Sequence, residues 1–214
     1  MRDLVILGSA PMPGYDPRYK FYVDKTAFQQ DADIWAFNSF ARILPRTDAV
    51  FQIHLPGRYR NQPSWEWLKT TKATVYMREV DPEVPTSVAY PFEEVYELTR
   101  NVRQGVKQLE PIKFMTSTAP FAIALAILQG RPKIHFYGFG LEQDTEYFDQ
   151  RDCILFWMGF AAGRGISMDI HCLDNIFKRE IYFKPSDKRL FEEERQQCQE
   201  IVIKANLSED MPMQ

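Results

Sequence analysis

The sequence predicts an α/β fold in which a mostly parallel sheet is covered by helices on both faces. Short apolar segments with the length of strands alternate along the chain with segments that have helical features. The strand segments are apolar at consecutive positions, which is typical of strands buried on both faces. The chain has 214 residues, 45% of them hydrophobic, and this is enough for a single domain with its own core.

Four strands are expected in the first half of the chain. They are residues 4–7, 33–37, 49–54 and 74–77. Residues 8–19 hold three Pro and two Gly and are expected to form a loop. A short helix is expected at 64–71 and a Pro-rich extended segment at 82–91. Residues 92–108 have apolar residues at helical spacing, which predicts an amphipathic helix.

Three more strands are expected in the second half, at residues 112–115, 134–137 and 167–171. A buried helix at 121–128 stops at Gly130, and a second helix at 151–162 is ended by Gly163. Residues 187–204 predict a charged, peripheral helix. We therefore expect one α/β domain at residues 1–180, followed by a peripheral helix and tail at 181–214.

Composition and charge argue against several function classes. A net charge of −3 does not suit a dedicated nucleic-acid-binding protein, although a local basic patch is compatible with it. No apolar segment approaches the about 20 residues that span a membrane. The three cysteines are widely spaced, which indicates reduced thiols in an intracellular protein. Met1 leads almost directly into the first strand, so no signal peptide is expected and the predicted location is the cytoplasm.

The carboxyl ends of the strands are the expected place for a ligand, as in other open α/β sheets. The loop that begins with Gly8, Ser9 and Ala10 matches neither a Gly-x-Gly-x-x-Gly nor a Walker A pattern. Its small residues would let backbone N–H groups approach a phosphate, and the alternative is an ordinary turn. The hydroxyl groups of residues 116–118 precede a helix, where they suit an anionic group or simply cap the helix.

His54 is the candidate general base among the three histidines, because it ends a predicted strand at the expected ligand edge. A structural role is the alternative for His54. His135 lies within an apolar strand and is expected to be a core histidine. His171 and Cys172 are adjacent on a strand and point to opposite faces, so they do not form a Cys–His dyad.

An acidic segment follows the turn at Gly138 and Phe139. Its carboxylates are Glu142, Asp144, Glu146 and Asp149. They could act in acid–base chemistry or form a solvated loop, and because their spacing matches no metal-binding pattern, no metal is expected. Tyr147 and Arg151 lie beside them, and Arg151 could pair with this segment or bind an anionic ligand.

Five motifs occur in an order that resembles one group of proteins. They are Leu-Gly-Ser-Ala-Pro after the first strand, Asp-Ile-Trp-Ala-Phe-Asn at the second, Thr-Asp-Ala-Val-Phe at the third, Lys-Phe-Met-Thr-Ser-Thr before the buried helix, and Lys-Ile-His-Phe-Tyr-Gly-Phe-Gly after it. This series resembles the bacterial sialyltransferases, which have a modified Rossmann fold, and the related motility-accessory-factor and hydroxymethylpterin pyrophosphokinase-like proteins. Residues 144–151 are similar to a stretch found in phage and prophage proteins of this group. The resemblance covers about residues 3–175 and implies a Rossmann-like, sialyltransferase-like domain.

The resemblance implies a nucleotide sugar, of the CMP type, across the strand ends. The positions that match donor contacts are Gly8, Ser9, Ala10, Asn38, Thr116, Ser117, Thr118, Gly138 and Phe139. Tyr147 and Arg151 are further candidate ligand contacts. Transfer in such enzymes is independent of a metal, so no metal cofactor is expected.

The resemblance implies a phage-encoded glycosyltransferase acting in the host cytoplasm. The sialyltransferases carry a catalytic histidine after the turn that matches Gly138, whereas residues 140–165 hold no histidine here. The candidate bases are therefore His54, Asp144 and Glu146. Two alternatives stay open: a non-catalytic accessory protein that binds or sequesters a nucleotide, and a Mg²⁺-dependent pyrophosphoryl transferase. Four Trp and many Phe leave room for a homodimer interface.

Overall fold

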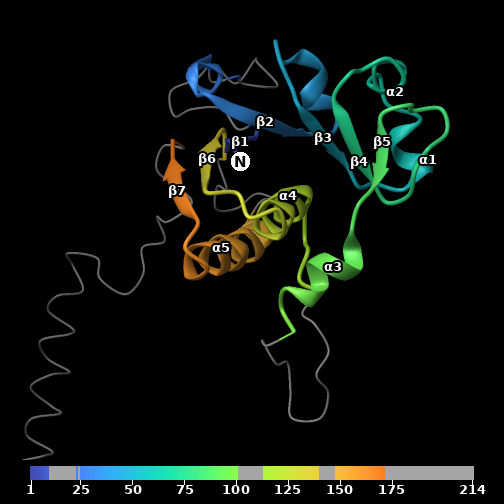
Figure 1. The fold of residues 1–214 in the computed structure, drawn as a ribbon. Coiled ribbons are helices and arrows are strands. Elements are labelled where there is room, and N and C mark those ends of the chain that lie inside the picture. The colour runs from blue at the N-terminus through green and yellow to red at the C-terminus, as the bar shows by residue number, and fades with distance from the viewer. Residues whose placement is uncertain (10–22, 24, 101–112, 140–147, 172–214) are drawn as a thin grey trace, which may run out of the picture. The chain divides into compact units, whose positions relative to one another are not determined.

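The computed structural model describes residues 1–9, 23, 25–100, 113–139 and 148–171. These residues lie within one compact unit, Met1–Ile176, whose chain path is drawn in Figure 1. The helix expected at 187–204 lies outside the described residues, so the division at residue 180 stays a prediction. No helix in the described part of the chain has the length and apolar character needed to span a membrane.

A seven-stranded sheet forms the centre of this unit, and every strand pairing in it is parallel. The strands are β1 (Asp3–Leu7), β2 (Ala32–Phe37), β3 (Ala49–Gln52), β4 (Thr74–Met77), β5 (Ser87–Ala89), β6 (Lys133–Tyr137) and β7 (Ser167–Ile170). Their order across the sheet is β5-β4-β3-β2-β1-β6-β7. The predicted α/β fold with a parallel sheet is confirmed.

The strand order reverses next to β1. The chain adds β2, β3, β4 and β5 on one side of β1, and then returns to add β6 and β7 on the other side. In open α/β sheets, ligands bind outside the carboxyl ends of the strands at such a reversal. The carboxyl ends of β1 and β6 are therefore the expected position of a ligand.

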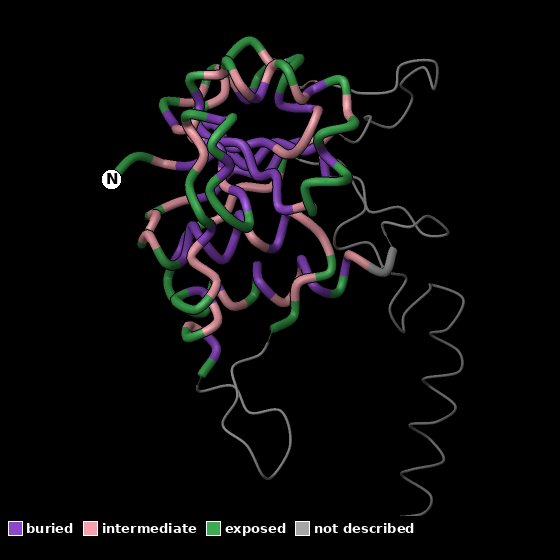
Figure 2. The backbone as a smooth tube through the Cα atoms, turned by 90° about the vertical axis from the view of Figure 1, so that its right-hand side faces the viewer, coloured by how far each residue is buried: buried purple, intermediate pink, exposed green. Residues whose placement is uncertain are grey.

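Both faces of the sheet are covered. Leu4 and Ile6 of β1 lie in a core shared with α4 (Thr118–Leu128) and α5 (Phe148–Gly163), the two longest helices labelled in Figure 1. Val5 and Leu7 point to a second core on the opposite face. Figure 2 shows the strands as the buried centre of the unit. Burial on both faces explains why the strand segments are apolar at consecutive positions, since each fully buried aliphatic side chain contributes about 1.5–3 kcal/mol.

Short helices cover the second core. They are the 3₁₀ helices η1 (Lys25–Gln29) and η2 (Asn38–Ile43) and the single-turn helices α1 (Pro56–Tyr59) and α2 (Trp65–Leu68). The remaining helix, α3 (Phe92–Glu97), contacts α4. Because α4 also packs on the sheet and on α5, it is buried around most of its circumference and needs no polar face.

The predicted elements are confirmed where their apolar residues pack on the sheet. The strands expected at 4–7, 33–37, 74–77, 134–137 and 167–171 match β1, β2, β4, β6 and β7 to within one residue at each end. The helices expected at 121–128 and 151–162 lie within α4 and α5, and α2 lies within the expected short helix. β3 ends at Gln52, two residues before the predicted strand end at His54.

Three predicted elements differ. Residues 113–115 form no strand, because the main chain at Phe114 is bonded to α5 instead of to a neighbouring strand. The helix expected at 92–108 ends at Glu97 and continues as a turn to Arg100, while residues 101–108 lie outside the described residues. The segment at 82–91, which was expected to be extended but not part of the sheet, contains the edge strand β5.

Candidate functional site

Two glycines bring the ends of β1 and β6 together. The N–H group of Gly8 donates a hydrogen bond of 2.8 Å to the carbonyl oxygen of Tyr137. A Cβ atom built on Gly8 would overlap the carbonyl oxygen of Gly138, and a Cβ atom on Gly138 would overlap that of Gly8. Gly138 also has a φ of +66°, a conformation that disfavours side chains. The reversal point of the sheet is therefore lined by bare backbone.

Polar residues lie beside these glycines in the register of the sheet. Leu7 pairs with Ala36, and Phe37 pairs with Phe51. If the register of β1 with β2 is continued by two residues past Leu7, Ser9 lies opposite Asn38. If the register of β2 with β3 is continued by one residue past Phe37, Asn38 lies opposite Gln52. Asn38 begins η2 with a φ of 48°, the only positive φ of a non-glycine residue in the described ranges, and asparagine tolerates this conformation well.

Four buried polar atoms at these ends have no hydrogen-bond partner among the described residues. They are Oδ1 of Asn38, Oε1 and Nε2 of Gln52, and Oγ of Ser117. Gln52 is 0% exposed, so its amide is fully removed from bulk water. A buried polar group without a partner costs about 1–3 kcal/mol, and polar atoms of a ligand can remove this cost.

The segment before α4 is held by α5. The carbonyl oxygen of Phe114 accepts hydrogen bonds from Nε1 of Trp157 (2.8 Å) and from Sγ of Cys153 (3.1 Å). The N–H group of Thr116 lies 3.5 Å from the same sulfur. Burial raises the pKa of the Cys153 thiol, which keeps it protonated and able to donate. These contacts fix the chain immediately before the helix N-terminus.

Ser117 occupies the N-cap position of α4, but its side chain makes no capping hydrogen bond. Its backbone is extended, with φ −153° and ψ −179°. The capping role considered for this hydroxyl is therefore not seen, and Oγ stays without a partner in the described part of the chain. The first N–H groups of an α-helix have no partner within the helix, so they and this hydroxyl together can receive an anionic group.

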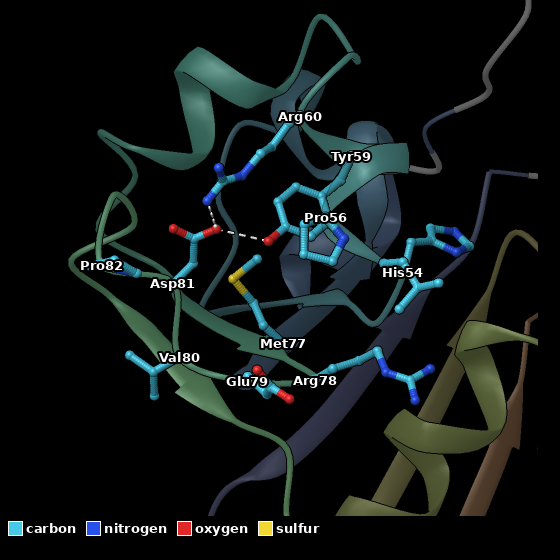
Figure 3. A pocket seen from close by; sticks show the side chains of 11 residues that line it. His54, Pro56, Tyr59, Arg60, Met77, Arg78, Glu79, Val80, Asp81 and Pro82 are labelled. Atoms are coloured by element: carbon cyan, nitrogen blue, oxygen red, sulfur yellow. Dashed lines mark hydrogen bonds and ion pairs between the residues drawn. The ribbon is translucent and has the colours of Figure 1, made fainter.

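His54 lies in a separate pocket of about 250 Å³ at the ends of β3 and β4 (Figure 3). Its lining includes none of the other predicted site residues. Burial, and then the positive charge of Arg58, lower the pKa of His54. The imidazole is therefore neutral near pH 7 and able to accept a proton, as a general base must.

The far side of this pocket is built by a buried carboxylate. Oδ2 of Asp81 accepts a 2.8 Å hydrogen bond from the Tyr59 hydroxyl and a 2.9 Å bond from Nη2 of Arg60 (Figure 3). Burial alone would raise the pKa of Asp81, but the hydrogen bonds from Arg60 and Tyr59 outweigh it and lower that pKa. Burial, together with the bond to Asp81, raises the pKa of Tyr59 to about 12. This cluster fastens α1 and the residue after it to the loop after β4.

Of the remaining predicted site residues, Thr118, Phe139 and Arg151 are described, and Thr118 is the first residue of α4. Phe139 is buried and packs its ring against Phe37 and Phe136. The predicted ligand contact of this residue is therefore left to its main chain. Arg151 is buried within α5. The other four, Ala10, Asp144, Glu146 and Tyr147, lie outside the described residues.

Sequence reasoning missed Gln52 and the contacts made by Asp81. Gln52 could have been noticed as a polar residue in the apolar segment at the end of β3. Asp81 carried no such signal, since it follows three exposed residues, and the side chains that bind its carboxylate, Tyr59 and Arg60, are about twenty residues away in the sequence. Comparisons of this chain with protein-family models, with curated proteins and with solved structures found no match.

Proposed function

We propose that this protein binds a nucleotide sugar at the carboxyl ends of β1, β2, β3 and β6, and that it transfers the sugar to an acceptor hydroxyl. One observation carries the binding proposal: the bare backbone at the reversal point lies at the same edge of the sheet as Oδ1 of Asn38 and the side-chain amide of Gln52, which are buried and have no hydrogen-bond partner in the described part of the chain. Concave sites with a few convergent polar groups are typical ligand sites of such sheets.

The polar groups at this edge suit the parts of a nucleotide. Backbone N–H groups after Gly8, and those at the start of α4 with the Ser117 hydroxyl, favour a phosphate. The side-chain amides of Asn38 and Gln52 both donate and accept, which suits a base or a ribose. None of these residues is acidic, so an anionic ligand meets no repulsion from them.

His54 supports the proposal of transfer. In a direct displacement, an acceptor oxygen forms a bond to the anomeric carbon while the bond from that carbon to the phosphate oxygen breaks, and the phosphate leaves with the electron pair. In this proposal the acceptor lies in the pocket of His54, which follows Gln52 by two residues at the end of β3, and the acceptor proton goes to the neutral imidazole of His54. The phosphate charge is met by N–H and hydroxyl donors. A CMP-type donor and metal-independent transfer are the expectations carried over from the sialyltransferase resemblance.

Loss of the polar groups is expected to weaken nucleotide binding about fivefold for each group, because one hydrogen bond contributes about 1 kcal/mol. The variants are Asn38→Gly, which keeps the positive φ, and Ser117→Ala. The measurement is calorimetric titration with the best ligand from a thermal-shift panel of nucleoside monophosphates, diphosphates and sugar conjugates. The matched controls are Asn61→Gly in the turn after α1 and Ser167→Ala at the opposite end of the sheet, which should bind like the unchanged protein. Absence of a shift with every nucleotide would contradict the proposal.

Removal of the base is expected to stop transfer and leave donor binding intact. His54→Ala should lower kcat by about 10²- to 10⁴-fold, the usual contribution of general base catalysis. The readout is release of nucleoside monophosphate from the sugar donor, together with the donor Kd. Full transfer activity in His54→Ala would reject His54 as the base, and tight donor binding without any turnover in the unchanged protein would favour the non-catalytic alternative.

A further inference from the structure

A cluster of metal-ligating side chains lies on β6 and β7, and the proposed nucleotide site does not use it. His135 comes from β6, while Asp169 and His171 come from β7 and from the residue directly after it. His135 and Asp169 are register partners in the parallel pair. His171 is two residues further along, and its N–H group donates a 2.9 Å hydrogen bond to the carbonyl of Phe136. All three side chains therefore point to the same face of the sheet.

The distances in this cluster suit a metal ion. Nδ1 of His135 lies 3.3 Å from Nε2 of His171 and 3.5 Å from Oδ2 of Asp169. One ligand atom from each of the three residues lies within 4.8 Å of the others. Two ligands at the Zn²⁺ distance of about 2.0–2.1 Å in a tetrahedral site are about 3.3–3.4 Å apart. The two measured distances from Nδ1 are close to that separation.

The surroundings of both imidazoles suit a bound metal ion. Nε2 of His135 points toward Oδ2 of Asp3 at 3.6 Å, on the side away from the cluster. Metal-bound histidines usually present their second nitrogen to a carboxylate in this way. The His171 ring stacks on Tyr137, with centroids 4.1 Å apart and planes at 4°. Tyr137 is in turn held by a 3.0 Å hydrogen bond from Gln30 to its hydroxyl.

We propose that His135, Asp169 and His171 bind a divalent late transition-metal ion, with Zn²⁺ as the expected ion. Two imidazoles and one carboxylate are ligands that Zn²⁺ prefers, and three protein ligands leave a fourth position for water. His135 is only 5% exposed, whereas His171 is exposed on the edge strand, so an ion can enter from solvent. This site does not depend on the proposed nucleotide function and can be tested without any nucleotide.

Lys133 provides a further test of the proposed metal site. Its Nζ atom lies 2.5 Å from Oδ2 of Asp169, the oxygen that also faces His135. A lysine at this place competes with a cation for the carboxylate and repels it. Lys133→Ala is therefore expected to tighten Zn²⁺ binding severalfold. If the two histidines merely share a hydrogen bond across 3.3 Å, the Lys133 substitution has no metal-dependent effect.

The experiment is a competition titration of the full chain, freed of metal, with Zn²⁺ and a chromophoric chelator. The expected result is one Zn²⁺ per chain, with a Kd at least tenfold weaker in His171→Ala and in Asp169→Asn, and about tenfold weaker in Asp3→Asn. His54→Ala and Asp31→Asn are matched controls from outside the cluster, and both should bind Zn²⁺ like the unchanged protein. Excess Mg²⁺ should not compete, because it prefers six oxygen ligands.

Co²⁺ provides a second readout that does not depend on how stable each variant is. The expected spectrum of the unchanged protein has the strong d–d bands of four-coordinate Co²⁺ and lacks a thiolate charge-transfer band. The proposal is overturned if no Zn²⁺ binds, if binding survives both His171→Ala and Asp169→Asn, or if the spectrum shows thiolate ligands.

Discussion

Replacement of Gly138 with alanine is expected to lower the free energy of unfolding by about 3 kcal/mol, the sum of about 1–2 kcal/mol of backbone strain and about 1–3 kcal/mol of overpacking. The strain arises because Gly138 has a φ of +66°. The overpacking arises because the new Cβ atom would overlap the carbonyl oxygen of Gly8, a main-chain atom that cannot rotate away. Urea denaturation measures the difference, with the midpoint and slope fitted separately.

Gly130 offers a matched control for this prediction. It has the same φ of +66°, at the end of α4, but a Cβ atom there would have no neighbour within 4 Å. Gly130→Ala is therefore expected to cost only about 1 kcal/mol, from the strain alone. The difference between the two variants isolates the contact between Gly8 and Gly138. Equal losses in the two variants would mean that the ends of β1 and β6 can separate without cost.

Trp157→Ala is expected to destabilise the protein by about 4 kcal/mol, within the usual range for loss of a large core side chain. Trp157 is 0% exposed on α5 and packs edge-on against Phe156 and Phe160, with ring centroids 5.4 Å and 5.6 Å away. Its indole N–H also donates to the carbonyl of Phe114. Removal of the ring leaves a cavity and takes away one of the three hydrogen bonds that hold the segment before α4.

Two further variants separate the packing from the hydrogen bond. Trp157→Phe keeps an aromatic ring and removes the indole donor, so we expect a loss of about 1–2 kcal/mol. Trp67 is only partly buried at the edge of the second core, and Trp67→Ala is expected to cost clearly less than Trp157→Ala. Thermal and urea unfolding of the three variants test this order, and equal losses in Trp67→Ala and Trp157→Ala would contradict it.

The elements that could be predicted from the sequence are those whose own residues carry the pattern. β4 has the predicted bounds at residues 74–77, because its apolar residues lie between polar neighbours. β5 was missed because it is an edge strand with two of its three residues exposed, so it has no apolar pattern. The strand expected at 112–115 has such a pattern, but the ring of Phe114 packs on Phe156 of α5, and the described residues 113–115 form no strand.

The candidate sites could be predicted only in part, because they depend on contacts between residues that are distant in the sequence. The positions of Gly8 and Asn38 follow from strand ends, and strand ends could be predicted. The amide of Gln52, which has no partner among the described residues, and the approach of His171 to His135 could not be predicted, because both depend on which strands are neighbours. Two histidines on separate predicted strands become a pair only when β6 and β7 are known to be adjacent.

The strand order also has a consequence for folding. β1, β2, β3 and β4 each pair with the strand that comes next along the chain, whereas the second partner of β1 is β6, where Leu4 pairs with Ile134. A pairing between residues so distant in sequence forms late, because it closes a long loop before its contacts give any stabilisation. Gly8 and Gly138 sit at the end of that pairing. The proposed nucleotide site is therefore completed by the pairing of the sheet that is most distant in sequence. A chain that has folded only as far as β5 has the ends of β1, β2 and β3 but lacks the end of β6.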